Sequence, residues 1–239
     1  MAKLVFDIET SALPPEHFDA AQQEYLFRDC EKIADELARG ARRAEIQQQF
    51  NLWPFTAQVV CIAMLNAESS RGQVLFTAED YEDDAGEAGP VEYVPCVDEI
   101  ELLTAFWDIA RHYEHIVTFN GRAFDVPFVY LRSALLNVPI SRKDWLGYRY
   151  QTEPHCDLAE QLTFYGVSGR EGAARRFNLD FYCKAFGIES PKSYGVTGRD
   201  INALITEGRF REIAEYCLRD VRATVVLFQI WRDRLAGVK

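Results

Sequence analysis

The sequence lacks a hydrophobic run long enough to cross a membrane. Its longest uninterrupted apolar stretch runs from Val59 to Leu65, whereas a membrane-spanning helix needs about 20 apolar residues. The first apolar residues, Leu4 to Phe6, are followed at once by Asp7, so the N-terminus has no apolar core of a signal peptide. We therefore expect a cytoplasmic protein that does not bind a membrane.

The sequence also lacks the cysteine spacing of a zinc or redox site. Its six cysteines form no C-x-x-C pair and have no neighbouring histidine pattern, which excludes a zinc knuckle and a dithiol redox motif. Reduced, partly buried thiols are the expectation. There is no internal repeat or low-complexity segment, and the content of 48% hydrophobic and 26% charged residues is typical of a folded globular chain.

Basic residues are in the minority, which is unusual for a protein that binds nucleic acid. The formal net charge is −11, from 26 Lys and Arg against 37 Asp and Glu. However, the stretch 78–101 holds ten acids and no Lys or Arg, and the rest of the chain carries only −1, with +4 in residues 166–239. Because the acidity is concentrated in one segment, the global charge does not exclude a nucleic-acid partner.

The hydrophobic pattern predicts an α/β domain with a mixed sheet. Short apolar runs indicate β-strands at 3–9, 59–65, 73–77 and 116–119, with the first strand broken at 11–15 and a hairpin turn at 69–72. Helical spacing of apolar residues indicates one or two helices within 16–50, and further helices at 100–113, 124–136 and about 210–235. We expect a single domain over 1–239 with two insertions, one helical at about 16–50 and one acidic at about 78–97.

Two carboxylates lie within the first predicted strand, in Phe6-Asp7-Ile8-Glu9-Thr10. Side chains alternate along a strand, so Asp7 and Glu9 share one face. Unpaired ionised acids in a buried strand cost several kcal/mol, and hard divalent cations prefer such oxygen ligands. The D-x-E spacing alone is uninformative, because it recurs in the helical stretch at 29–31 and in the acidic segment at 80–82. Only the first copy lies among buried apolar residues.

Two further polar motifs come later in the chain. The segment 117–127, Val-Thr-Phe-Asn-Gly-Arg-Ala-Phe-Asp-Val-Pro, places polar residues at the C-terminal end of a strand, where α/β sheets bind ligands. Taken alone, Asp125 is typical of an acid at a helix N-terminus. Tyr216 and Asp220 are spaced i, i+4 on the last helix, on a face away from its core stripe, although the same spacing recurs at Tyr25 and Asp29.

Together, these motifs resemble the DEDDy 3′-to-5′ exonucleases of the ribonuclease H-like fold, in particular the exonuclease domain of family B DNA polymerases and its stand-alone predicted relatives. The resemblance covers nearly the whole chain. It rests on Phe-Asp-Ile-Glu-Thr at 6–10, Phe-Asn-Gly-x-x-Phe-Asp-x-Pro at 119–127, His-Cys-Asp-Leu at 155–158 and Tyr-Cys-x-x-Asp-Val-x-x-Thr at 216–224. The histidine variant of the superfamily would place His at residue 215, which is Glu here, so the resemblance implies the tyrosine subtype.

The resemblance implies hydrolysis of phosphodiester bonds at the 3′ end of single-stranded or frayed DNA, with release of nucleoside 5′-monophosphates. Two divalent ions, Mg²⁺ or Mn²⁺, roughly 3.5–4 Å apart would assist the reaction. Asp7 would bridge both ions, Glu9 and Asp220 would complete the first, and Asp125 would hold the second directly or through water. Tyr216 would orient the attacking water, since its ordinary pKa of about 10 favours hydrogen bonding over proton abstraction at neutral pH.

Other residues have weaker assignments. The resemblance implies that Thr10, Asn120 and Phe124 grip the frayed 3′ end. His155 has a structural or a functional role, and Asp157 anchors the neighbouring helix. Several basic residues could contact phosphates or simply form a solvated face: Arg170, Arg175, Arg176 and Lys192. The helical insertion carries Arg39, Arg42 and Arg43 and is interpreted as a lid over the site or as a packed side helix.

Two other functions are compatible with the sequence. The same chemistry could act on RNA, because no residue identifies a reader of the 2′-hydroxyl. A catalytically silent ribonuclease H-like module could instead bind nucleic acid or a partner protein. Retention of Asp7, Glu9, Asp125, Asp220 and Tyr216 argues against silence, because buried acids that need a cation have no structural use without one.

Overall fold

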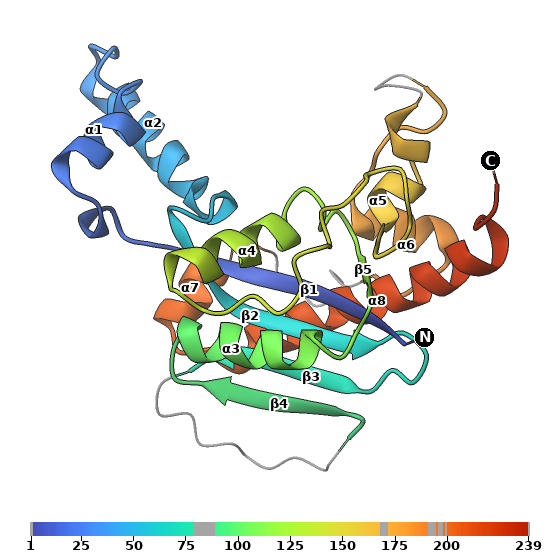
Figure 1. Ribbon diagram of the computed structural model, residues 1–239. Coiled ribbons are helices and arrows are strands. Elements are labelled where there is room, and N and C mark those ends of the chain that lie inside the picture. Colours follow the sequence, from blue (N-terminus) through green and yellow to red (C-terminus); the bar gives the residue numbers. More distant parts are fainter. Residues whose placement is uncertain are drawn as a thin grey trace.

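The fold is built on one mixed β-sheet. The computed structural model describes residues 2–78, 89–167, 172–190, 195, 198 and 200–238. Its six strands lie in the order β4-β3-β2-β1-β5-β6 (Figure 1). The strands are β1 (Lys3–Ala12), β2 (Ala57–Asn66), β3 (Gly72–Thr77), β4 (Val91–Cys96), β5 (His115–Thr118) and β6 (His155–Asp157). The pairs β1/β2 and β2/β3 are antiparallel, whereas β3/β4, β1/β5 and β5/β6 are parallel, which confirms the mixed sheet expected from the sequence.

Helices flank both faces of this sheet (Figure 1). They are α1 (Ala20–Phe27), α2 (Glu36–Gln48), α3 (Glu99–Ala110), α4 (Asp125–Leu135), α5 (Leu158–Gln161), α6 (Leu179–Phe186), α7 (Ile201–Thr206) and α8 (Phe210–Arg234), with short 3₁₀ turns η1 (Pro15–His17), η2 (Phe50–Leu52) and η3 (Phe164–Gly166). Across the part of the chain that the structure describes, no helix combines the length and apolarity needed to cross a membrane.

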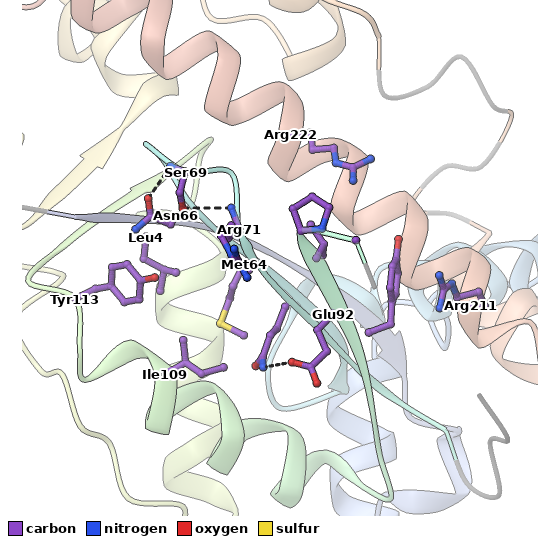
Figure 2. A pocket seen from close by; sticks show the side chains of 16 residues that line it. Leu4, Met64, Asn66, Ser69, Arg71, Glu92, Ile109, Tyr113, Arg211 and Arg222 are labelled. Atoms are coloured by element: carbon purple, nitrogen blue, oxygen red, sulfur yellow. Dashed lines mark hydrogen bonds between the residues drawn. The ribbon is translucent and has the colours of Figure 1, made fainter. Parts of the chain in front are cut away.

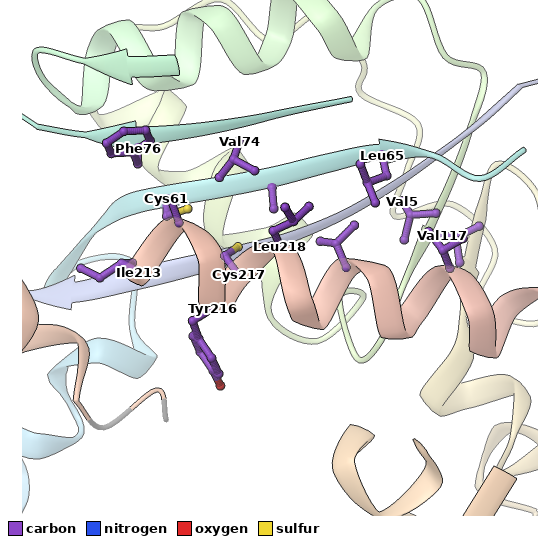
Figure 3. Close-up of a cluster of buried hydrophobic side chains, with 14 of the residues drawn as sticks. Val5, Cys61, Leu65, Val74, Phe76, Val117, Ile213, Tyr216, Cys217 and Leu218 are labelled. Atoms are coloured by element: carbon purple, nitrogen blue, oxygen red, sulfur yellow. The ribbon is translucent and has the colours of Figure 1, made fainter. Parts of the chain in front are cut away.

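Side-chain alternation along β1 divides the core into two layers. Leu4, Phe6 and Ile8 face one layer, which the side chains of α3 and α4 complete. Val5 faces the other layer, against α8 (Figure 3). Every residue of the stripe on α8 is buried, as its helical spacing indicates: Ile213, Cys217, Val221, Thr224, Phe228 and Trp231. Because α8 covers the face from which Val5 points, the two acids that follow at alternate positions on β1 also point toward α8.

The first strand is longer than the sequence indicates. Ser11 continues β1 and pairs with Gln58 on β2, although we expected it to begin a break. The reason is a distant partner. Asn202 of α7 accepts hydrogen bonds at Oδ1 from the Ser11 hydroxyl at 3.1 Å and from the Ala12 amide at 3.0 Å. The register shifts between Glu9 and Thr10, where a β-bulge re-aims the strand.

Two strands have no counterpart among the sequence predictions. Strand β4 lies within the segment interpreted as an acidic insertion, where residues 91–96 pair with β3; residues 79–88 of that segment lie outside the described residues. Strand β6 has only three residues, which is too short for a period-two pattern to identify. Both strands lie at edges of the sheet.

The expected helical insertion forms an arm that projects from the end of β1 (Figure 1). Its helices α1 and α2 begin at capping aspartates, Asp19 and Asp35. The arm has a small hydrophobic cluster of its own, composed of Phe18, Phe27, Cys30, Ile46 and Phe50. Asn51 ties the arm to the sheet, since its carbonyl accepts the Thr10 hydroxyl at 2.8 Å and its side chain reaches Asn202 at 3.1 Å.

A buried ion pair joins α3 to α4. The Arg132 guanidinium donates to both carboxylate oxygens of Glu99, at 2.9 and 2.5 Å, and to the Pro54 carbonyl at 3.0 Å. Glu99 also accepts the Val59 amide at 2.7 Å. The two side chains are only 9% and 8% exposed, so removal of one partner leaves a desolvated charge behind.

The Arg132→Ala variant should therefore lose about 3–5 kcal/mol in the free energy of unfolding, the usual effect of orphaning one member of a buried pair. Urea denaturation measures this loss. The matched control is Arg111→Ala, whose pair with Asp108 is exposed at 3.3 Å and should contribute about 1 kcal/mol at most. Equal losses for the two variants would show that Glu99 finds another partner.

Candidate active site

The two acids of β1 lie beside the last helix. Asp7 and Glu9 pair across the sheet with Ala63 and Cys61, both of which belong to the layer that α8 covers. Cys217 of α8 donates its thiol to the Asp7 carbonyl at 3.4 Å. One potential ligand atom from each of Asp7, Glu9 and Cys217 can be chosen so that all three lie within 4.8 Å of one another.

A third acid joins them from α4. Asp125 is the first residue of this helix and is 3% exposed. Its Oδ1 accepts the backbone amide of Ile8 at 3.1 Å, which places its carboxylate against β1 between the two acids of that strand. The helix N-terminus favours a negative charge at this position.

Tyr216 and Asp220 complete the group from α8. They lie about one turn apart, as i and i+4 residues on a helix do. Tyr216 is buried, yet it points to a different side of α8 from Cys217 and Leu218 (Figure 3). A cavity of about 600 Å³ lies beside this group, and its lining includes Asp7, Asp125 and Asp220 but not Glu9 or Tyr216. The structure thus brings together residues from three elements that are far apart in the sequence.

Three of these carboxyl groups have raised pKa values, first of all because they are buried. Burial, reinforced by the charges of Asp125, Asp220 and Glu9, raises the pKa of Asp7 well above its ordinary value. The pKa of Glu9 is raised by burial and by the charges of Asp220 and Asp125. Burial raises the pKa of Asp125 to about 7. These shifts express the cost of ionising several acids in one desolvated place.

The donor set fits hard divalent cations. Carboxylate oxygens are the ligands that Mg²⁺ and Mn²⁺ prefer, and a cation between these groups would relieve the repulsion that raises the pKa values of Asp7 and Glu9. Asp7, Glu9, Asp125 and Asp220 are the residues that could hold such ions. The Cys217 thiol is a poor candidate, because burial keeps its pKa well above the ordinary value.

The Tyr216 hydroxyl keeps its proton at this site. Burial, together with the negative charges of Glu9, Asp220 and Asp7, raises the pKa of Tyr216 above its ordinary value. A protonated phenol donates a hydrogen bond and does not act as a base. The orientation of an attacking water by Tyr216 stays a prediction.

Two residues of β6 hold the turn that precedes Asp125. Asp157 accepts the amides of Asn120 and Arg122, both at 2.9 Å, and caps α5 through the amide of Ala159 at 3.0 Å. Asp157 thus anchors the helix as expected. It also holds the turn at Asn120 and Arg122, which the sequence did not indicate. Asn120 adopts a positive φ of 69°, and a Cβ at Gly121 would lie only 2.5 Å from the Thr118 hydroxyl, so the tight turn requires glycine there.

His155 has a structural place under the same turn. Its Nδ1 lies 3.2 Å from the Trp145 carbonyl, which can only accept, so Nδ1 carries the proton. Nε2, at 2.8 Å, therefore accepts from the Thr118 hydroxyl, whose oxygen accepts the Gly121 amide at 3.1 Å. Burial, with a smaller contribution from Arg122, lowers the pKa of His155 to about 3. The imidazole is thus neutral and buried.

The residues expected to grip the substrate have different surroundings. Asn120 and Phe124 line the cavity, and the Phe124 ring lies 5.3 Å from that of Phe128. Thr10 does not line the cavity, and its hydroxyl donates to Asn51 in the arm. The Arg176 guanidinium also lines the cavity and donates to the Asn120 side-chain oxygen.

No periodic pattern marks residues 172–178, so no sequence signal distinguishes Arg176 from the other basic residues. Phe177, which also lines the cavity, was missed for the same reason. Arg170 and Lys192 lie outside the described residues. In the arm, Arg42 pairs with Glu45 at 2.9 Å, and Arg43 packs 3.7 Å from the centre of the Phe27 ring.

The low pKa of His155 predicts a loss of stability in acid. Between about pH 6.5 and pH 3 the unfolded chain binds a proton at this imidazole and the folded chain does not, so stability falls as the pH falls through this window. One such proton gives a slope of about 1.4 kcal/mol per pH unit. In urea denaturation, His155→Gln should flatten the pH dependence between pH 6 and pH 4.5 relative to wild type. The exposed His112→Gln is the control, and parallel slopes for all three proteins would contradict this assignment.

Archaeal DNA polymerases are among the known proteins to which this chain is similar. DNA polymerase 1 of Saccharolobus solfataricus is 25% identical over 178 residues, which cover 71% of this chain and 19% of the polymerase. DNA polymerase 1 of Sulfurisphaera ohwakuensis is 30% identical over 136 residues, covering 54% of this chain and 15% of the polymerase. The chain thus spans about a fifth of the length of these relatives.

The family B DNA polymerase of the hyperthermophilic archaeon Pyrobaculum calidifontis has a similar structure. The match has a TM-score of 0.57 and 19% identity, and it covers 97% of this chain and 24% of the polymerase. This likeness confirms the ribonuclease H-like fold expected from the sequence. Residues 55–236 match the family described as "Predicted 3'-5' exonuclease related to the exonuclease domain of PolB". The chain belongs to this family of PolB-related exonucleases, as indicated by the motifs at 119–127, 155–158 and 216–224, which lie within the matched residues.

Proposed function

We propose that this protein is a metal-dependent 3′-to-5′ exonuclease that removes nucleotides from single-stranded or frayed DNA ends. The observation that carries the proposal is the convergence of acids from β1, α4 and α8 at one cavity, with a protonated tyrosine beside them. Membership of a PolB-related exonuclease family supports it. The names of the curated relatives, which are DNA polymerases, favour DNA over RNA.

Each acid has a role in this proposal. The charges of three neighbouring acids raise the pKa of Asp7, so Asp7 would be the central member of the set that holds divalent cations. Glu9, Asp125 and Asp220 would supply the remaining carboxylate ligands. Divalent cations held in this way supply Lewis-acid activation of water and stabilise the charge on the phosphate and the leaving 3′ oxygen.

The remaining side chains orient the reacting groups. The Tyr216 hydroxyl donates a hydrogen bond to the attacking water and fixes its direction. The Phe124 ring packs against the terminal base or sugar, a contact that does not depend on the base sequence. Asn120 contributes a hydrogen bond to the end of the strand, and Arg176, which now donates to Asn120, contacts a phosphate of the bound strand. Thr10 contributes indirectly, because its hydroxyl donates to the Asn51 carbonyl and so fixes the position of β1 next to the site.

Substitution of Asp7 tests the proposal directly. With Mg²⁺ or Mn²⁺ and 3′- or 5′-labelled single-stranded DNA, the wild type should give a ladder that shortens from the 3′ end, and chelator should abolish it. Asp7→Ala should lower the rate roughly a thousandfold or more, because several kcal/mol of charge stabilisation are lost. The control is Asp29→Ala, which changes the D-x-E motif of the arm, where Asp29 pairs with Lys32 at 2.8 Å.

Other outcomes of this assay distinguish the alternatives. Degradation of a matched RNA, with DNA left intact, would show that the substrate is RNA and not DNA. Inactivity of the wild type on both substrates, with retained binding, would indicate a silent nucleic-acid-binding module. Equal activity of the Asp7 and Asp29 variants would remove the acid cluster from the mechanism.

The role of Tyr216 gives a separate expectation. Tyr216→Phe removes one hydrogen-bond donor and keeps the ring that packs in the core. The value of kcat should fall about tenfold to a hundredfold, the range expected for one hydrogen bond near a charged group, whereas KM should change little. Steady-state hydrolysis of labelled single-stranded DNA measures both constants. An unchanged kcat would show that the water is oriented by the acids alone.

A further inference from the structure

Three tyrosines form an aromatic surface near the turn that carries Asn120. Tyr148 and Tyr150 are 67% and 55% exposed, and their ring centroids lie 5.6 Å apart. The Tyr165 ring of η3 lies 5.1 Å from that of Tyr150. We call Tyr148, Tyr150 and Tyr165 the tyrosine platform.

Neighbouring side chains and the backbone hold the platform in place. The Arg149 guanidinium lies 5.9 Å from the centre of the Tyr150 ring and pairs with Glu160 at 2.8 Å. Gln161 donates to the Tyr165 hydroxyl at 2.8 Å. Phe164 and Tyr165 have positive φ angles of 47° and 56°, a conformation that bulky residues rarely adopt and that often marks functional segments.

One arginine connects the platform to the active site. Arg122 lies in the turn between Asn120 and Phe124, both of which line the catalytic cavity. Its guanidinium donates to the carbonyl of Gly147, the residue before Tyr148, at 3.3 Å. It also pairs at 3.2 Å with Glu160, the acid that holds Arg149. Arg122 thus connects the loop that carries the platform to the turn whose residues Asn120 and Phe124 line the cavity.

We propose that the tyrosine platform binds the bases of the single strand immediately upstream of the nucleotide held at the carboxylates. This inference rests on the proposed function and adds a second contact region for its substrate. Exposed aromatic faces stack on bases of any sequence, and an adjacent arginine attracts the phosphates. Another pocket lies at the opposite, β4 edge of the sheet, and the residues that line it include Arg71, Arg211 and Arg222 (Figure 2).

The test compares a substrate that reaches the platform with one that does not. The p-nitrophenyl ester of thymidine 5′-monophosphate occupies only the cavity, whereas oligothymidylates of increasing length extend beyond it. For the double variant Tyr148→Ala/Tyr150→Ala, kcat/KM on the longer oligonucleotides should fall about tenfold or more, since each stacked base contributes on the order of one tenfold step or more. Hydrolysis of the ester should stay at the wild-type value.

Two sets of variants serve as controls. Tyr148→Phe/Tyr150→Phe keeps the rings and should retain activity on every length. Tyr25→Ala removes a tyrosine of the arm that is 66% exposed, and it should leave kcat/KM unchanged on both the ester and the oligonucleotides. Thermal unfolding verifies that each variant is folded, and Tyr148→Ala alone replaces the double variant if the latter unfolds, because its ring is the more exposed of the two.

A binding measurement separates this inference from the proposed function. Fluorescence anisotropy of a 5′-labelled oligothymidylate, recorded with chelator so that no hydrolysis occurs, should show a Kd about tenfold higher for the double variant. If the wild type hydrolyses neither substrate but this difference in Kd remains, the exonuclease proposal fails and the platform stands. If the double variant matches wild type in Kd and in length dependence, the platform proposal is overturned.

Discussion

The burial and mutual repulsion of the carboxylates in the middle of β1 form the constraint on which the rest of the structure depends. Two acids on a central strand are covered by α8, and burial and neighbouring charges raise their pKa values. A surface strand would not create this cost, because water would solvate the charges. The two hydrophobic layers on either side of β1 must therefore supply the stability with which these acids are held together. Packing in these layers offsets the destabilisation that the buried acids cause.

Rigidity around the acids comes from groups that touch no ligand. Asp157 and His155 fix the turn 120–124 through backbone amides and the Thr118 hydroxyl. Ile8 donates its amide to Asp125, so the third acid is positioned by the strand that carries the first two. Reacting groups that are pre-positioned in this way need no rearrangement during the reaction.

The sequence predicted the parts of this structure that depend on periodicity. Strand β1 and the buried stripe of α8 follow from alternation and helical spacing, and Asp125 and Tyr216 were selected as candidate site residues because their motifs occur in the order typical of one family. Local patterns failed where distant partners decide the outcome. Asn202 extends β1, and β6 is too short to show a pattern. Arg176 lines the cavity together with residues that are distant from it in the sequence, so no local pattern marks it. The pairing of β4 beside β3 was hidden by the acidic composition around it.

The arm that carries α1 and α2 can unfold locally, apart from the sheet. Its small cluster of buried residues is separate from both layers that enclose the sheet, and Asn51 anchors it beside Thr10. A unit with its own core can unfold without exposing the core of its neighbour. Amide hydrogens of α1 and α2 will therefore exchange with solvent through openings that leave β1 and α8 protected, so two levels of protection coexist in one chain.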